Sequence, residues 1–168
     1  VPFRVDELIR EVIESLEPRA EQKQIVLEPV LSGGLPYAEA DEERIRQVLI
    51  NLIDNAIKYS NHGGRVEVVA RFVEPSSIKI SVVDDGIGVS AEHRPRLTER
   101  FYRVDKSRSR SQGGTGLGLS IVKHILGAHG KKLQVRSSEG NGSTFGFMLD
   151  GVTVSEPQVM MEPVAEPA

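Results

Sequence analysis

The stretch QVLINLIDNAIKYS (47–60) restricts the fold more than any other, because it lies in a helix expected from Asp41 to about Tyr59 whose apolar residues repeat with the period of an α-helix. Its apolar side chains gather on one side: Ile45, Leu49, Leu52, Ile53 and Ala56. Asn51, Asn55 and Lys58 fall on the opposite side, within about 60° of one another. We therefore expect a helix that packs one side on a core and presents two amides and an amine on the other.

The two asparagines need an explanation, because solvent-facing helix positions favour Glu, Lys, Gln or Arg. A solvated polar side would account for Lys58 but poorly for Asn51 and Asn55. A carboxamide oxygen is also a neutral ligand for Mg²⁺, which binds through one or two protein oxygens together with substrate phosphates. The helix by itself leaves both interpretations open.

The remaining segments predict strands and helices in no regular order, which indicates an α+β fold. A helix over 6–17 is expected to be disturbed or ended by Pro18. Strands at 65–73 and 77–85 flank the sequence Glu74-Pro75-Ser76 and predict a hairpin. The other expected elements are a strand over 24–31, a turn over 32–36, a helix from Asp41 to about Tyr59, a short helical patch near 91–100, a helix over 117–130, and closing strands within 133–138 and 143–149.

The composition fits one domain followed by a tail. The chain has 168 residues, 39% of them hydrophobic, with no cysteine and a net charge of −3. The lack of cysteine excludes a disulfide framework. The negative net charge gives no electrostatic reason to expect nucleic-acid binding. Residues 150–168 contain acids and prolines but no Lys or Arg, so we expect a domain over 1–149 and a disordered tail after it. Because the chain starts at Val1 rather than Met, we expect a piece of a longer protein.

Two glycine-rich segments are candidates for holding phosphate. VVDDGIGV (82–89) runs from a strand into glycines, and GGTGLGLS (113–120) places glycines at the start of a helix. Glycine lets a backbone approach a ligand closely, and a helix N-terminus offers free N–H groups. Neither segment is a Walker A loop, and GGTGLG fits the dinucleotide spacing GxGxxG only loosely. Either segment alone is also compatible with an ordinary loop.

Taken together and in this order, several motifs resemble those of one family. NLIDNAIKYS, DDGIG, ERFYRVD, GGTGLGLSIVK and GNGSTF are similar to the N, G1, F and G2 boxes and closing strand of bacterial sensor histidine kinases. The resemblance covers about residues 3–149 and is to their catalytic and ATP-binding domain, of the Bergerat type shared with gyrase, Hsp90 and MutL. RLTERFYRVDKSRS adds a likeness to phosphate-sensing members. The fold implied is a two-layer α/β sandwich, with a mixed sheet of about five strands and three helices on one face.

The resemblance implies that ATP and Mg²⁺ bind along the asparagine helix. Asn55 would ligate Mg²⁺, with Asn51 supporting the ion and the phosphates. Lys58 would contact phosphate and Tyr59 the ribose region. A lid between Phe101 and Gly113 would carry Arg103 to the γ-phosphate, although the same basic segment is also compatible with a solvated loop. The residues implied for catalysis are Asn51, Lys58 and Arg103.

The resemblance places adenine near the end of the strand over 77–85. Asp84 would accept a hydrogen bond from the adenine amine, and Gly86 and Gly88 would let the base lie close. Asp85 is expected to be a solvated neighbour, and Thr144 would sit near the adenine end. The nucleotide-binding residues implied in the second glycine segment are Gly114, Thr115, Gly116, Leu117 and Gly118.

Asn51 separates the classes of ATP chemistry. In the ATPases and the anti-sigma serine kinases, the residue one turn before the metal asparagine is a glutamate that acts as general base. Asn51 cannot take a proton, whereas a histidine acceptor already carries a lone pair, so a histidine kinase is favoured. Besides a histidine kinase domain and an ATPase, the sequence leaves a third class open, a nucleotide-responsive docking module without chemistry of its own. The four histidines, none in an H-E/D-x-R-T-P setting, are His62, His93, His124 and His129.

The resemblance also implies the partners of this chain. We expect a phosphoacceptor and dimerisation domain of the same kinase that carries the acceptor histidine, a response regulator downstream, and no nucleic acid. The isolated domain is expected to be a monomer on the cytoplasmic side, with a parent protein anchored in the membrane if it is a membrane sensor.

Overall fold

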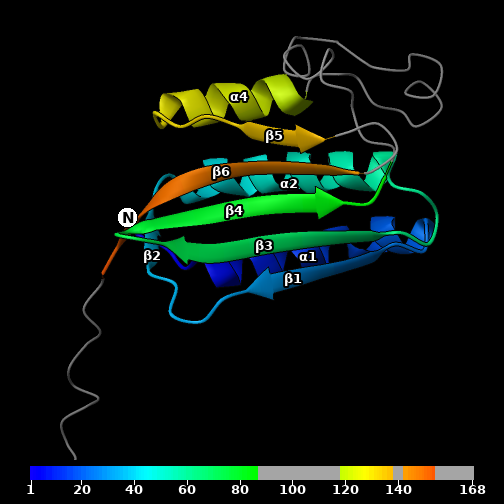
Figure 1. The fold of residues 1–168 in the computed structure, drawn as a ribbon, viewed down its shortest axis with the longest axis horizontal. Coiled ribbons are helices and arrows are strands. Elements are labelled where there is room, and N and C mark those ends of the chain that lie inside the picture. The colour runs from blue at the N-terminus through cyan, green and yellow to red at the C-terminus, as the bar shows by residue number, and fades with distance from the viewer. Residues whose placement is uncertain (87–117, 138–141, 154–168) are drawn as a thin grey trace, which may run out of the picture.

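The computed structural model describes residues 1–86, 118–137 and 142–153. These residues form three helices and six strands (Figure 1). In chain order they are α1 (Val5–Gln22), β1 (Val26–Leu31), β2 (Tyr37–Glu39), α2 (Glu42–Tyr59), β3 (Arg65–Val73), β4 (Ser77–Asp84), α4 (Gly118–Ala128), β5 (Gln134–Ser137) and β6 (Ser143–Val152). The helical patch expected near 91–100 lies outside the described residues.

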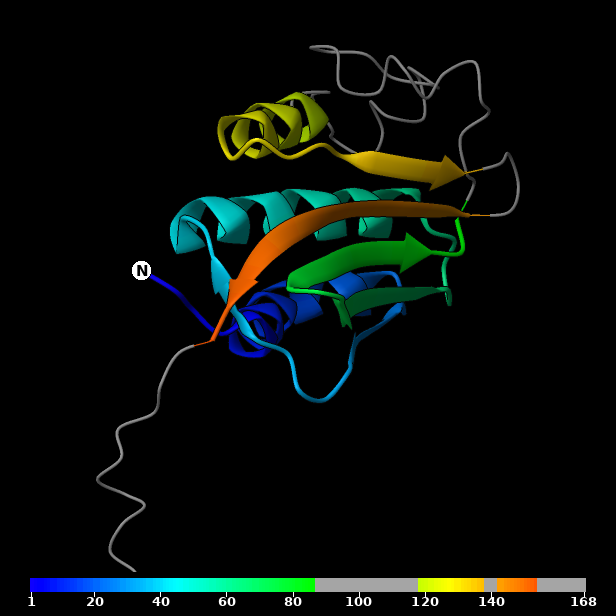
Figure 2. The same ribbon diagram turned by 60° about the vertical axis from the view of Figure 1, so that its left-hand side comes forward.

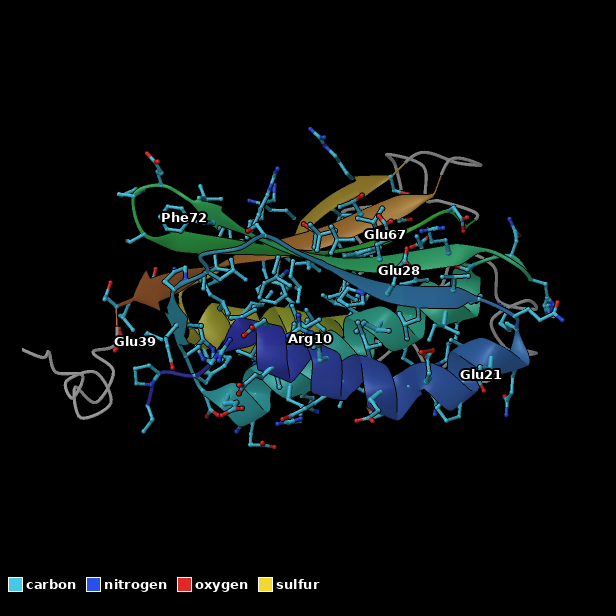
Figure 3. The ribbon with its side chains drawn as sticks, turned by 90° about the horizontal axis from the view of Figure 1, so that it is seen from below. Arg10, Glu21, Glu28, Glu39, Glu67 and Phe72 are labelled. Carbon is cyan, nitrogen blue, oxygen red and sulfur yellow. The ribbon has the colours of Figure 1, made fainter. Side chains whose placement is uncertain are left out.

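The strands form one mixed sheet in the order β1-β3-β4-β6-β2, with β5 also paired to β6. β1 runs parallel to β3, and the other pairs are antiparallel. Seen along the layers, the described helices all lie on one face of the sheet (Figure 3). This arrangement confirms the predicted two-layer α/β sandwich, and the predicted hairpin is the β3–β4 pair.

The core lies between α2 and the inner face of the sheet. Alternate residues of the three central strands face it and are 5% exposed or less, namely Val66, Val68, Ala70, Ile78, Ile80, Val82, Phe145, Phe147 and Leu149. The predicted apolar side of α2 is buried as well, at 0–3% exposure for Ile45, Leu49, Leu52, Ile53 and Ala56. In two views α2 lies between α1 and α4 and packs on both (Figures 1 and 2). Its amide side is therefore directed away from the core.

Two element boundaries and one additional strand differ from the sequence prediction. Helix α1 does not end at Pro18 but continues to Gln22, because Ala20, with 0% exposure, anchors its last turn in the core. Strand β2 was not predicted, since three residues show no periodicity, and it forms by pairing with the end of β6. That strand runs to Val152, so residues 150–152 belong to the sheet, while 154–168 lie outside the described residues.

Strand β1 lies at one edge of the described sheet and carries Pro29 within it. Proline cannot donate to a strand ladder, which confines it to edge strands, strand ends and bulges. Val26 and Val30 of the same strand are 48% and 44% exposed. None of the described helices combines the length and the apolar character that a membrane span requires.

Gly151→Ala should lower the free energy of unfolding by about 1–3 kcal/mol, because it overpacks the junction of β6 with the turn before β2. A Cβ at residue 151 would lie 2.6 Å from Pro36 Cγ and 2.9 Å from the Ser76 carbonyl oxygen. Urea unfolding measures the effect. The control is Gly33→Ala, whose Cβ meets nothing within 4 Å. Equal stability of the two variants would contradict the packing of residue 151 in the sheet.

Candidate nucleotide-binding site

Asp84 ends strand β4 with its side chain on the helix side of the sheet, and the residue is only 7% exposed. Its Oδ1 accepts a hydrogen bond from the Gly86 N–H at 2.9 Å. Burial raises the pKa of the Asp84 carboxyl to about 6, and the nearby charge of Asp85 acts in the same direction. Hydrogen bonds from the backbone of Gly86 and Ser143 oppose that rise in pKa. Asp84 is thus a buried acceptor that is costly to keep ionised.

The sheet register places Ser143, not Thr144, beside Asp84. Ser143 lies directly opposite Asp84, whereas Thr144 pairs with Val83. Directly opposite residues share a face of the sheet, so the Thr144 side chain lies on the other face. The side chain beside Asp84 is therefore that of Ser143, which is 8% exposed, and not that of Thr144, which the resemblance had placed near the adenine. Counting strand alternation back from the core residue Phe145 would have found it.

The hydrogen bonds of Ser137 determine whether the Ser143 hydroxyl acts as a donor or as an acceptor toward it. Ser137 Oγ donates to the Gly142 carbonyl oxygen at 3.0 Å and lies 2.9 Å from Ser143 Oγ. Since the Ser137 hydroxyl has one proton, Ser143 Oγ donates to Ser137 and retains its lone pairs as an acceptor. Gly142 has φ +83°, and a Cβ there would lie 2.2 Å from the Asp84 carbonyl oxygen. Only glycine lets residue 142 lie this close to the end of β4.

Gly86 and Asp85 hold the backbone around this carboxyl. A Cβ at Gly86 would lie 2.2 Å from the Tyr59 carbonyl oxygen, so the end of α2 requires glycine there whether or not a base lies close. Both carboxylate oxygens of Asp85 accept the Arg65 N–H, at 3.1 and 3.2 Å. Asp85 therefore holds the start of β3, and it is exposed, as expected of a solvated neighbour of Asp84.

Asn51 and Gly118, expected in two separate motifs, lie together. Gly118 begins α4, and a Cβ there would lie 3.9 Å from Asn51 Cβ. Asn51 Nδ2 is buried and has no hydrogen-bond partner within the described part of the chain. An unsatisfied buried donor costs about 1–3 kcal/mol, and a phosphate oxygen at the start of α4 would satisfy it. Asn55 follows one turn later and is half-buried, so its amide oxygen is available to a hard cation.

The last turn of α2 is held from α1. Lys23 Nζ donates to the carbonyl oxygens of Ile57, Lys58 and Ser60, at 2.9, 2.9 and 2.8 Å. A cation that binds the last carbonyls of a helix also interacts favourably with its dipole. This contact fixes the helix end from which Tyr59 and Lys58 extend. Lys58 Nζ itself lies 3.4 Å from Asp54 Oδ2, an ion pair that the sequence analysis did not include although the spacing is i, i+4.

Of the described histidines, only His129 has a hydrogen bond that joins two helices. His129 Nδ1 lies 2.9 Å from the Ile125 carbonyl oxygen, and its Nε2 accepts the Asp41 N–H at 3.1 Å. This ring therefore joins the end of α4 to the start of α2. His62 and His124 are exposed. The predicted site residues outside the described part of the chain are Gly88, Arg103, Gly114, Thr115, Gly116 and Leu117, and His93 lies there too.

Comparison with known proteins identifies the family. The sequence model described as "Histidine kinase-, DNA gyrase B-, and HSP90-like ATPase" matches residues 40–152, and the chain belongs to this family. It is 48% identical over 122 residues to the sensor histidine kinase YkoH of Bacillus subtilis strain 168, covering 73% of this chain and 26% of that protein. It is 47% identical over 120 residues to the phosphate regulon sensor protein PhoR of Pseudomonas aeruginosa, covering 71% and 27%.

Solved structures share the fold. The full-length ShkA structure in complex with AMPPNP superposes with a TM-score of 0.81 at 33% identity, covering 92% of this chain and 32% of that one. The histidine kinase ThkA in complex with the response regulator TrrA gives 0.75 at 27% identity, covering 90% and 42%. The chain is thus an ATP-binding catalytic domain of the sensor histidine kinase type. The chain spans about a quarter of the length of these two curated relatives (26% and 27%). Its identity to the phosphate regulon sensor protein is nearly equal to its identity to YkoH, so these comparisons do not favour the phosphate-sensing members over others.

The raised pKa of Asp84 makes a prediction for the stability of the nucleotide-free protein. Because the pKa is about 6 when folded and near 3.8 when unfolded, ionisation destabilises the fold. The penalty is absent at low pH, grows as pH rises through this window, and is complete above about pH 6. Asp84→Asn should raise the free energy of unfolding at pH 7.5 by up to about 3 kcal/mol and by much less at pH 4. Urea unfolding at both pH values measures this.

The matched control for this experiment is Asp85→Asn. Asp85 is exposed and its carboxylate binds a backbone N–H, so its replacement should stabilise the protein at pH 7.5 far less than Asp84→Asn does, because it removes only the smaller, charge-based part of the rise in the Asp84 pKa. An Asp84→Asn variant with the same stability difference from wild type at both pH values would contradict the raised pKa.

Proposed function

We propose that this domain donates the γ-phosphoryl group of ATP to a histidine on a separate dimerisation and phosphoacceptor domain, as part of two-component signalling. The observation that carries this proposal is the amide at position 51. It faces the start of α4 with a buried donor that has no partner among the described residues, and it cannot act as a base. A carboxylate there would activate water, whereas an amide holds phosphate without promoting its hydrolysis.

The transfer needs positioning more than covalent chemistry from this chain. The lone pair of a neutral imidazole nitrogen attacks the γ-phosphorus in line, a P–N bond forms, and the bond to the β,γ-bridging oxygen breaks to release ADP. The acceptor ring then loses its N–H proton to a base on its own domain or to water. Asn51 and Lys58 would hold phosphate oxygens during this step, with Arg103 assisting from the expected lid.

Mg²⁺ would be held by Asn55 through its amide oxygen and by the phosphates of ATP. When bound, the ion would neutralise charge on the transferred group and on the leaving ADP. Adenine would donate its amine to Asp84, with Tyr59 toward the ribose. Gly118 and the expected residues Gly114, Thr115, Gly116 and Leu117 would supply backbone N–H groups, and Gly88 would allow close approach of the base.

The partners follow from this chemistry. The chain has no histidine in a phosphoacceptor motif, so the acceptor is on another domain of the same kinase. A response regulator then receives the phosphoryl group, in line with the ThkA–TrrA complex. Because ATP is the donor, we place the domain on the cytoplasmic side. Its expected boundary at residue 149 moves to 152, where β6 ends.

Asp84→Asn should weaken ATP binding about 10- to 150-fold, the loss of a charge-assisted hydrogen bond of about 1.5–3 kcal/mol. Asp85→Asn should leave ATP affinity unchanged, since that carboxylate binds the Arg65 N–H. Calorimetry with ATP and GTP measures both variants, and wild type should prefer ATP because guanine presents an acceptor to Asp84. Equal affinities of wild type for ATP and GTP would refute the assignment of the base site.

The 168-residue chain with radiolabelled ATP and Mg²⁺ should acquire no acid-labile label on its own histidines. A separate helical-hairpin domain with the cognate H-E/D-x-R-T-P histidine should become labelled when it is added. The same hairpin with that histidine replaced by glutamine is the control. Phosphohistidine on the isolated chain would overturn the assignment of donor and acceptor to different domains.

A further inference from the structure

One carboxylate on α2 is shared between two cations. Asp54 Oδ1 accepts a hydrogen bond from Arg19 of α1, and Asp54 Oδ2 lies 3.4 Å from Lys58 Nζ. The Asp54 side chain is 19% exposed and that of Lys58 is 28% exposed, so neither is fully solvated. Together with Gln22, Lys23, Ile57 and His62, these three residues line a groove of about 550 Å³ between α1 and α2.

The helix places Lys58 between this carboxylate and the amides. At about 100° per residue, Lys58 projects about 40° from Asp54 and about 20° from Asn51. Side chains on a helix lean toward its N-terminus, so the Lys58 stem runs back toward Asp54, and Asn51 lies about one turn further along the same side of the helix. Its ammonium therefore has a choice of two acceptors, the Asp54 carboxylate on the α1 side and a phosphate oxygen on the Asn51 side.

We propose that Asp54 is a positioning residue that sets how strongly Lys58 binds the phosphates of the nucleotide, and that Arg19 weakens the attraction between Asp54 and Lys58. This inference rests on the proposed function, in which Lys58 contacts phosphate. Asp54 holds Lys58 on the α1 side in the nucleotide-free protein, so ATP must compete for the ammonium. Arg19 occupies the other oxygen and neutralises part of the carboxylate charge, which makes that competition easier.

Replacing Asp54 and replacing Arg19 should change ATP affinity in opposite directions. Asp54→Asn frees Lys58 and should tighten ATP binding about 2- to 5-fold, the range expected for a partly exposed ion pair. Arg19→Gln leaves the carboxylate charge to Lys58 alone and should weaken ATP binding about 2- to 3-fold. Adenosine has no phosphate, so its affinity should change in neither variant. A general disturbance of the fold would alter adenosine binding as well.

Calorimetry with ATP and adenosine tests the proposal on six proteins: wild type, Asp54→Asn, Arg19→Gln, Lys58→Met, the double variant Asp54→Asn/Lys58→Met, and Arg46→Gln. Arg46 is the matched control, because it also pairs with carboxylates on α1 and α2 but lies three turns earlier on the helix. Its replacement should leave the ratio of ATP to adenosine affinity as in wild type. Thermal melts establish that each variant is folded.

The double variant decides whether Asp54 acts through Lys58. The proposal predicts that Asp54→Asn has no effect on ATP affinity once Lys58 is methionine. A gain that persists in the double variant would mean simple charge repulsion and would overturn the proposal. The proposal would also be overturned if Asp54→Asn left ATP affinity unchanged while Lys58→Met weakened ATP binding. If Lys58→Met binds ATP as wild type does, the phosphate role of Lys58 in the proposed function is wrong, and the inference falls with it.

Discussion

The burial of one side of α2 against the sheet is the interaction on which the rest of this domain depends. Leu49, Leu52 and Ile53 are 0–1% exposed, which fixes the rotation of the helix about its axis. With that rotation fixed, Asn51 faces the start of α4, and the helix end meets Gly86 beside Asp84. The phosphate end and the base end of the candidate site are thus both positioned by one helix.

Much of this arrangement follows from the sequence, because period and polarity act locally. The amphipathic pattern of α2 and the turn residues between β3 and β4 predict their elements closely. Properties set by contacts between distant segments were not predictable in the same way. Helix α1 passes Pro18 because Ala20 packs in the core, and β2 exists because β6 pairs with it. The choice of Thr144 over Ser143 failed for another reason, since the alternation that separates them was present in the sequence.

The candidate site combines groups that do not favour the empty folded state. Asp84 is buried as an acid whose ionisation is costly, and Asn51 has a buried donor without a partner in the described chain. Under the proposed function, both features would become favourable when a ligand supplies an amine to Asp84 and a phosphate oxygen to Asn51. This is the usual relation between stability and function in binding sites, where residues that weaken the fold are retained for what they bind.

The exposed edge strand β1 has a consequence for how the domain behaves at high concentration. A free strand edge is a template on which a second chain can add its own strand, and burial of the exposed Val26 and Val30 side chains would stabilise that contact. Pro29 stands between them and has no N–H to offer to an incoming strand. This one residue therefore limits pairing between the β1 edge and a strand of another copy when the protein is concentrated.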